Sequence, residues 1–319
     1  MARKQKAQAA KPKTHVAIIL DKSGSMSGTK ESAISGFNET VQDIKERAKT
    51  QEIYCSLVTF NGEVYEHLWN VPAEQLAEAN PADYQPNGST AMRDAVGYTV
   101  QKLLNTTDHE NTEVSYLIYV ISDGETNADH HYGTEALKEL MSGVQATKRW
   151  TITYIGCSES YMQEIARQTS TPIANMASWS NSTAGGVKKG FANVRSRTQK
   201  YFDERELGGV GSSNFASDQD GVVADYNQEA TFSAAAPQIY SADELAAVAD
   251  AVSLDLKSVL DKGPKYCVQA SQTYNGEALF ANSQKVEWAT NPVGQTNGGV
   301  SMAGVVNMAN VQNFAQAKK

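Results

Sequence analysis

The sequence predicts an α/β fold in which a mostly parallel sheet lies between layers of helices. Short apolar runs rich in β-branched residues alternate with longer segments of helical periodicity over the first two thirds of the chain. The run at 15–20 is almost continuously apolar, as expected for a strand that is buried on both faces of a sheet. A chain of 319 residues, 40% hydrophobic and 20% charged, can bury such a core, and these values exclude a collagen-like, coiled-coil or wholly disordered protein.

The individual elements follow in a regular order. After the first strand and a polar loop, apolar residues recur at steps of three and four between 34 and 48 and predict a helix. Two strand-like runs at 53–60 and 63–69 are joined by Asn61 and Gly62, a pair typical of tight hairpin turns, so these strands are predicted to be antiparallel. The other expected elements are a helix from 91 to about 104, a strand at 114–121, a helix at 134–148, a strand at 150–155, a helix at 161–168, a short strand at 172–176 and a helix at 184–201.

The composition changes after residue 204, where we predict that the first domain ends. The following stretch is rich in Gly, Ser and Ala, which is typical of a linker. An amphipathic helix is expected at 242–260, and the short β-like pieces after it fit no fold that we can assign. The predicted organisation is a basic flexible tail at 1–13, a domain at 14–204, a linker at 205–240 and a C-terminal extension at 241–319.

Charge and hydropathy exclude several classes of function. The net charge of −8 and a pI near 5.2 leave the body of the protein without the basic footprint of a nucleic-acid-binding protein. The sequence contains neither the roughly 7–15 apolar residues of a signal peptide nor the roughly 20 of a membrane-spanning helix, so we expect a cytoplasmic protein. The 3 cysteines are an odd number at wide spacings, and we expect free thiols.

Polar residues that suit a metal site lie next to the predicted strands. Asp21, Ser23 and Ser25 alternate along the loop after the first strand, and an extended backbone turns all three side chains to the same side. Thr90 precedes a predicted helix, and Asp123 follows a later strand. Ligands of open α/β sheets bind beyond the carboxyl ends of the strands, so these five residues are expected to converge.

The chemistry of these five side chains indicates the kind of ligand. Two carboxylates and three hydroxyls form an all-oxygen set, which suits Mg²⁺, Mn²⁺ or Ca²⁺ and not zinc or copper. Two acids on a doubly charged ion give about zero net charge, so the metal keeps its affinity for one further anionic ligand. A Glu or Asp carboxylate of another protein is the simplest such ligand. The sequence therefore predicts a site where a metal bridges to an acidic partner.

These residues and their neighbours resemble the metal-ion-dependent adhesion site of von Willebrand factor type A domains. The resemblance rests on Asp-x-Ser-x-Ser at 21–25, Gly-x-Thr at 88–90 and Ser-Asp-Gly at 122–124, each beside the expected strand or helix. The wider sequence from 13 to 204 is also similar to the small stand-alone type A domain proteins of bacteria and their phages, and segments such as Leu-Asp-Lys-Ser-Gly-Ser-Met at 20–26 carry this likeness.

The resemblance implies a doubly wound, Rossmann-like sheet with one antiparallel edge strand and helices on both faces. It implies that Ser23, Ser25 and Thr90 touch the metal directly, while Asp21 and Asp123 act mainly through water or as switchable ligands. Mg²⁺ is the expected cofactor, with Mn²⁺ or Ca²⁺ as alternatives, and the expected activity is binding without catalysis. A place in a phage particle becomes an alternative to the cytoplasm.

Other interpretations of the same residues stay open. The hydroxyls after the first strand could simply cap the next helix. A Mg²⁺-dependent phosphotransferase or hydrolase could use Asp21 as its nucleophile, although such sites usually carry a second acid where this chain has Ser23. An assembly protein could instead act through residues 205–319 by docking on a larger complex. We leave Asp94 out of the site, because the dipole of a helix explains an acid in its first turn as readily as a role beside the metal does.

Overall fold

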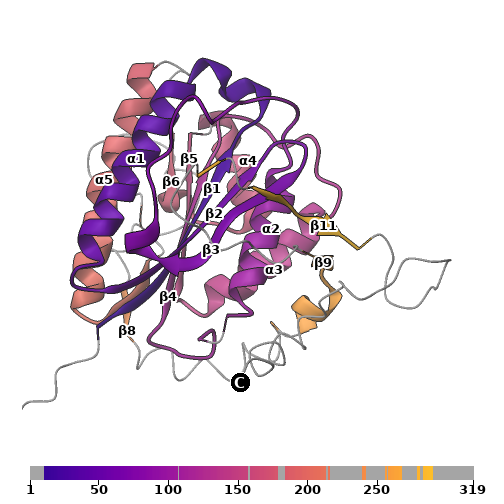
Figure 1. Ribbon diagram of the computed structural model, residues 1–319. Helices are drawn as coiled ribbons and strands as arrows, with labels where there is room; N and C mark the ends of the chain where they lie inside the picture. Colours follow the sequence, from indigo (N-terminus) through magenta and orange to yellow (C-terminus); the bar gives the residue numbers. More distant parts are fainter. Residues whose placement is uncertain are drawn as a thin grey trace, which may run out of the picture.

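A seven-stranded sheet in the order β10-β3-β2-β1-β4-β5-β6 forms the centre of the structure (Figure 1). The central strand β1 (Lys13–Asp21) pairs in parallel with β2 (Glu52–Phe60) and β4 (Ser115–Ile121). Beyond β4, the strands β5 (Trp150–Ile155) and β6 (Met176–Ala177) continue the parallel order. The computed structural model describes residues 11–106, 108–156, 159–178, 184–212, 215, 239–241, 256, 258–267, 279–280 and 283–289.

On the other side of β2, the sheet is antiparallel. Strand β3 (Val64–Pro72) returns along β2 after a tight turn, in which the Glu63 N–H donates to Asn61 Oδ1 at 3.1 Å. The predicted hairpin is therefore confirmed. One difference from the expectation concerns the edge of the sheet: β10 (Gln284–Lys285) pairs antiparallel with β3 at Glu66 and Tyr65, so β3 is not an open edge there.

Helices cover both faces of the sheet (Figure 1). On one face α1 (Lys30–Arg47) packs beside α5 (Ala184–Glu206), and on the other lie α2 (Met92–Leu103), α3 (Thr134–Ala146) and α4 (Glu159–Thr169). Each layer has its own hydrophobic core against the sheet. The predicted α/β fold with helices on both faces is thus confirmed.

The contact between α1 and α5 explains one glycine of the sequence. A Cβ atom added to Gly36 would lie 2.1 Å from Cγ of Phe191, so the ring of α5 packs directly on the backbone of α1. The apolar positions predicted between 34 and 48 are all buried: Ile34, Phe37, Val41 and Ile44 lie within α1, and Ala48 directly follows it. Burial of each such side chain stabilises the fold by roughly 1.5–3 kcal/mol relative to exposure, so this face of α1 fixes the helix to the sheet.

The prediction of a strand at 172–176 is largely wrong. The chain forms a single 3₁₀ turn, η3 (Ile173–Asn175), and pairs with β5 only in the two residues of β6 that follow. Pro172 has a φ of −57° and no N–H for a sheet ladder, and its carbonyl accepts from the Asn175 N–H at 2.8 Å. The apolar composition of this stretch therefore reflects burial rather than strand pairing.

Parts of the C-terminal extension pack against the sheet and its helices. Leu256, Tyr266 and Val286 belong to the core beside α2 and α3, whereas Leu279 is buried on the α1 side with Phe280 against it. The strands β9 (Tyr266–Cys267) and β11 (Glu287–Trp288) pair antiparallel, as do β7 (Gly209–Ser212) and β8 (Ile239–Ser241).

Several predictions about the ends of the chain fall outside the described residues. These are most of the basic tail, most of the linker at 205–240 and the first part of the helix expected at 242–260, although 256 and 258–262 are helical. Cys55 and Cys267 are free thiols as expected, while Cys157 is not among the described residues. Within the described part of the chain, no helix combines the length and the apolar character needed to cross a membrane.

Candidate metal site

Three loops meet at the carboxyl ends of β1 and β4. The first follows β1 and includes the 3₁₀ turn η1 (Gly24–Gly28), and the second precedes α2. Two backbone hydrogen bonds join them: the Asn87 N–H donates to the Lys22 carbonyl at 2.8 Å, and the Gly24 N–H donates to the Gly88 carbonyl at 3.0 Å. Gly88 has a φ of +76°, which a residue without a side chain adopts at little cost, so the glycine lets the second loop approach the first.

The third loop follows β4 and contains Asp123. It joins the first loop through a row of side-chain oxygens. The Ser25 hydroxyl donates to Asp123 Oδ1 at 2.7 Å, and the Ser23 and Ser25 hydroxyl oxygens lie 3.1 Å apart. Neighbouring oxygen ligands of an octahedral cation with metal–oxygen distances of about 2.0–2.1 Å are themselves about 3 Å apart. The spacing of these oxygens therefore fits adjacent ligands of a small divalent ion.

Asp21 lies behind this row and is fully buried. Its Oδ1 accepts from the Ser23 N–H and its Oδ2 from the Ser122 hydroxyl, both at 2.6 Å. Burial raises the pKa of Asp21 to about 6, the hydrogen bonds from Ser122 and Ser23 oppose this rise, and the charge of Asp123 adds to it. In the absence of a cation, Asp21 thus ionises at a higher pH than a free carboxyl, and a bound cation would lower its pKa again.

Neither acid of the site has a cationic partner within the described part of the chain, because no Lys, Arg or His forms an ion pair with Asp21 or Asp123. Further along the same loop, Asp129 differs, since its Oδ2 lies 3.0 Å from Nε of Arg93. The negative charge of the site is therefore left uncompensated by the protein, whereas that of its neighbour is not.

Thr90 is held mainly through its backbone. Its carbonyl accepts from the Thr126 hydroxyl at 3.0 Å and from the N–H groups of Asn127 and Ala128, and its own N–H donates to Asn127 Oδ1 at 2.9 Å. These bonds fasten the second loop to the third. Asp21, Ser23, Ser25 and Asp123 are thus linked by hydrogen bonds to one another or to shared neighbours, while within the described residues the Thr90 hydroxyl bonds to none of these four.

Asp94 is a residue whose position the sequence did not reveal. It is only 2% exposed, and its carboxylate accepts from three successive backbone N–H groups, those of His130 at 2.9 Å, His131 at 3.0 Å and Tyr132 at 2.7 Å. It therefore anchors the loop that begins at Asp123 to the start of α2. No local pattern indicated this role, because the groups that it binds lie far along the chain.

The described residues contain no group of three or more His, Cys, Asp or Glu side chains that could hold a metal. A candidate metal site in this part of the chain must therefore add other oxygen ligands, such as hydroxyls, to its carboxylates. The five residues predicted from the sequence supply such a set. Ser25 is exposed, Asp123 is partly exposed, and Asp21, Ser23 and Thr90 are buried, so the set opens to the surface at Ser25 and Asp123.

Comparison with solved structures yields distant likenesses. The PilB minor pilin from Streptococcus sanguinis is 14% identical, with 62% of this chain and 64% of that chain covered and a TM-score of 0.43. A von Willebrand factor type A structure from Catenulispora acidiphila is 14% identical, with 59% and 43% covered and a TM-score of 0.42. The vWF domain of the type V pili tip protein Mfa5 from Porphyromonas gingivalis is 17% identical, with 43% and 51% covered and a TM-score of 0.28.

In each of these three comparisons, this chain spans less than two thirds of the matched structure. No curated protein sequence matches the chain. The model of the von Willebrand factor type A domain family, in contrast, matches residues 15–186, which is more than half of the chain and contains all three loops. The mostly parallel sheet with helices on both faces agrees with that match, and the chain belongs to the von Willebrand factor type A domain family.

Proposed function

We propose that this chain is a protein-binding module that depends on a divalent metal, which bridges the three loops to an acidic side chain of a partner. The observation that carries the proposal is the pair of uncompensated carboxylates, Asp21 and Asp123, within a set of hydroxyl oxygens that opens to the surface. Mg²⁺ is the metal that we propose first, with Mn²⁺ or Ca²⁺ as alternatives. The proposal takes the site as a metal-ion-dependent adhesion site in a protein of the small stand-alone bacterial or phage type.

In this proposal the five residues have different roles. Ser23, Ser25 and Thr90 would bind the metal directly, and the 3.1 Å spacing of the two serine oxygens supports adjacent positions on it. Asp21 would act from behind through Ser23 or water, since both of its oxygens already accept hydrogen bonds. Asp123 would act through water or as a switchable ligand. The metal supplies a positive charge that remains open to one further carboxylate.

Two observations support binding without catalysis. A nucleophilic carboxylate must reach its substrate, but Asp21 is fully buried and both of its oxygens are engaged. The residue two positions on is Ser23, not the second acid of Mg²⁺-dependent phosphotransferases. We therefore propose no turnover, and a phosphatase assay with a small aryl phosphate in Mg²⁺ should give no activity above that of Asp21→Asn.

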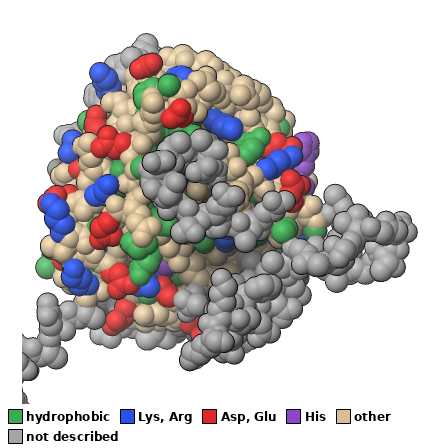
Figure 2. All heavy atoms as spheres, viewed as in Figure 1, with side chains coloured by type: hydrophobic (Ala, Val, Ile, Leu, Met, Phe, Trp, Pro, Cys, Tyr) green, Lys and Arg blue, Asp and Glu red, His purple; other side chains and the backbone are tan. Residues whose placement is uncertain are grey.

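The distribution of charged side chains on the surface beside α1 and α5 favours a partner other than nucleic acid. Acidic and basic side chains are interspersed over this side of the molecule (Figure 2), rather than gathered into the basic stripe that nucleic acid requires. The expected location, in the cytoplasm or in a phage particle, stays a prediction from the sequence. Docking on a larger complex through residues 205–319 likewise stays a prediction.

The experiment that tests the proposal is a thermal melt of the full chain in EDTA and in excess Mg²⁺, Mn²⁺ or Ca²⁺. Metal at about a hundred times its dissociation constant should add about 2.7 kcal/mol to the free energy of unfolding. Thr90→Ala should lose this increment, whereas Ser89→Ala, which removes the exposed hydroxyl next to it, should keep it. If no ion stabilises the wild type, or if both variants respond like it, the proposed metal site is wrong.

The bridge to an acidic partner can be tested with a carboxylate probe. At constant ionic strength, replacing chloride by acetate should further stabilise the metal-loaded wild type, because acetate supplies the anionic oxygen that a partner's Glu or Asp would provide. The same exchange should have no effect in EDTA or on Thr90→Ala. An equal effect of acetate in all three samples would indicate a general salt effect and contradict the bridge.

A further inference from the structure

Residues 279–280 and 283–289, here called the C-terminal strap, cross the edge of the sheet at β3. β10 pairs there with Tyr65 and Glu66, and the Val286 N–H donates to the Val64 carbonyl at 2.9 Å. An ion pair between Lys285 and Glu63, with a nitrogen–oxygen distance of 3.0 Å, lies beside this pairing. On either side of β10, the strap places an aromatic side chain against a different layer of the domain.

On the α1 side, the strap lies one side chain away from Asp21. The Phe280 ring packs against the rings of His67 and Tyr84, with centroid distances of 5.3 Å and 5.7 Å, and the Leu279 carbonyl accepts from His67 Nδ1 at 3.0 Å. Tyr84 is 1% exposed, and its hydroxyl donates to the backbone carbonyl of Asp21. Phe280 therefore supports the tyrosine that fixes the end of β1 where the first metal-site loop begins.

On the α2 and α3 side, the strap contacts the loop that begins at Asp123. The Trp288 ring stacks on His131 with a centroid distance of 4.2 Å and an interplanar angle of 11°, and it lies 6.1 Å from the ring of Tyr132. The N–H groups of these two residues are two of the three that Asp94 binds. Trp288 therefore covers the point at which this loop is anchored.

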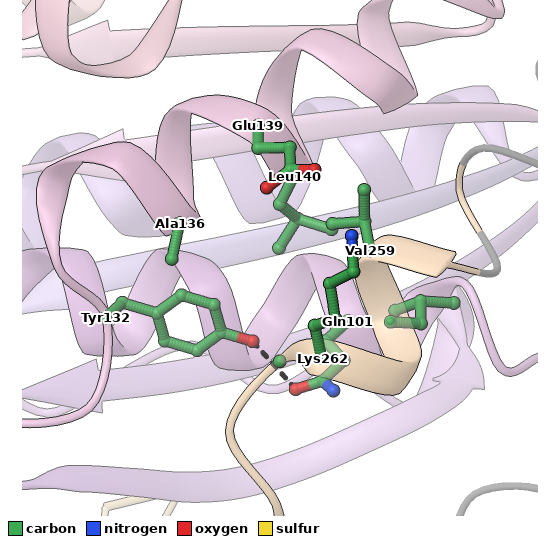
Figure 3. Close-up of a pocket in the computed structure, with 9 residues that line it drawn as sticks. Gln101, Tyr132, Ala136, Glu139, Leu140, Val259 and Lys262 are labelled. Carbon is green, nitrogen blue, oxygen red and sulfur yellow. Dashed lines mark hydrogen bonds between the residues drawn. The ribbon is translucent and has the colours of Figure 1, made fainter.

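Another part of the extension packs beside the same loop. Residues 259–263 close a small cavity of about 50 Å³ against α2 and α3, where the Tyr132 hydroxyl donates to Gln101 Oε1 at 2.7 Å (Figure 3). Leu256 fits against Gly143 of α3, where an added Cβ would lie 2.7 Å from Leu256 Cδ2. No hydrogen bond or ring contact among the described residues joins Leu256 to the three loops, so it offers a control within the same extension.

We propose that the C-terminal strap holds the two acid-bearing loops in their metal-binding arrangement, with Phe280 and Trp288 as positioning residues. This inference rests on the proposed metal site. Because coupling between two binding events is reciprocal, docking of the strap strengthens metal binding, and metal binding strengthens docking of the strap by the same factor. A partner that lifts the strap from β3 then releases the metal and whatever acidic protein the metal holds.

The test measures the dissociation constant of Mn²⁺ by calorimetry for the full-length wild type, Phe280→Ala, Trp288→Ala and the control Leu256→Ala. We expect a dissociation constant at least five times higher for the first two variants, in the range typical of coupled sites. Leu256→Ala should lower the melting temperature and leave the dissociation constant unchanged. Phe280→Leu and Trp288→Phe serve in place of any alanine variant that does not fold.

A second measurement needs no variant. The amide of Val286 bonds to β3 and does not touch the metal site, so its hydrogen exchange in the wild type should slow when Mn²⁺ is added. Unchanged exchange together with equal dissociation constants in all variants would overturn the role of the strap while leaving the metal site in place. An effect of Leu256→Ala as large as that of Trp288→Ala would also overturn it. A wild type that binds no metal would refute the proposed function, and this inference would fall with it.

Discussion

Strand β1 has a cluster of charged side chains at each end, and the two clusters differ in how their charge is balanced. At the amino end, Asp108 Oδ2 lies 2.7 Å from Nζ of Lys13 and 2.8 Å from Nε2 of His15. At the carboxyl end, Asp21 and Asp123 meet only hydroxyl and N–H donors among the described residues. The acid beside the amino end of β1 is therefore neutralised by the protein, whereas the two acids at its carboxyl end are not.

The surroundings of the two clusters differ in the same sense. At the amino end, rings from four neighbouring strands stack in a row, with centroid distances of 5.7 Å from Tyr54 to His15, 5.4 Å from His15 to Tyr116 and 4.0 Å from Tyr116 to Trp150. Burial lowers the pKa of His15 in this row. At the amino end, stacked rings cover an acid that has cationic partners, whereas the carboxyl end keeps polar oxygens near the surface. The difference indicates where the fold needs a component from outside.

The largest expected effect on stability is at the amino end of β1, where Asp108 lies. Asp108→Ala leaves the buried His15 without its acceptor and Lys13 with Glu52 alone, and it should lower the free energy of unfolding by up to about 3 kcal/mol, because a buried polar group loses its hydrogen-bond partner. Urea unfolding in EDTA measures this. Glu52→Ala, which removes a more exposed partner of Lys13, should cost less than about 1 kcal/mol. The increase in the free energy of unfolding on metal binding should persist in both variants. Its loss in Asp108→Ala would show that the amino end of β1 also serves the metal site.

At the carboxyl end of β1, removing the charge of Asp21 should raise the free energy of unfolding of the metal-free protein rather than lower it. Burial raises the pKa of Asp21 from 3.8 to about 6, so between about pH 4 and pH 6 the folded metal-free protein holds more protons than the unfolded one. Its free energy of unfolding therefore falls as the pH rises through this range. Asp21→Asn removes that penalty and should stabilise the metal-free protein by roughly 2 kcal/mol at pH 7 and not at pH 4.

Urea unfolding in EDTA at the two pH values checks this prediction. The Ser122 hydroxyl can reverse its hydrogen bond and accept from the new amide, so the change keeps the local contacts. The variant should also lose the increment from metal. Destabilisation of Asp21→Asn at pH 7 would instead show that the carboxylate is structural, like Asp108.

A smaller effect is expected at Asp94, which joins the open end to α2. Asp94→Asn presents an amide N–H₂ to one of the three backbone N–H groups and loses one hydrogen bond, which should cost roughly 1 kcal/mol. Because the loop after Asp123 is then less well anchored, the dissociation constant of Mn²⁺ should rise several-fold. Glu135→Gln, at an exposed acid in the first turn of α3, should not change it. Calorimetry on both variants decides whether Asp94 serves the site or only the helix.

The smallest expected effect on stability is at Ser25, which is exposed and donates to Asp123. Ser25→Ala should change the free energy of unfolding in EDTA by less than about 0.5 kcal/mol, as is usual for surface substitutions. It should nevertheless abolish most of the stabilisation by metal. The control is Ser27→Ala, since that hydroxyl bonds to the Gly24 carbonyl of the same loop. If Ser27→Ala alone lost the stabilisation by metal, the hydroxyl that binds the metal would be that of Ser27, and the assignment of Ser25 would be wrong.

The features that the sequence predicted well are those whose causes are local. The apolar run of β1, the periodicity of α1 and the turn at Asn61 and Gly62 each depend on residues a few positions apart, and all three are confirmed. The convergence of the loops also followed, because parallel strands place their carboxyl ends at one edge of the sheet. The metal itself and the roles of its five proposed ligands stay predictions.

The features that the sequence did not reveal depend on partners far along the chain. Gln284 pairs with Glu66, yet β10 is too short to show any alternation of its own. Asp94 is buried because of three N–H groups in a loop beyond β4. The prediction of a strand at 172–176 was largely wrong, because Pro172 and the turn after it leave only the two residues of β6 to pair with β5.

The pairing of β10 with β3 at the edge of the sheet also has a consequence for synthesis and folding. His67 and Leu279 are 212 positions apart in the chain, and contacts of such separation form late, since the entropy of closing a long loop must first be overcome. A ribosome completes all the elements from β1 to α5 before it reaches residue 279. During that interval β3 lacks its β10 partner, and an unpaired edge strand is a template for pairing with other chains. Nascent or truncated chains that end before residue 279 are therefore the forms of this protein most exposed to aggregation.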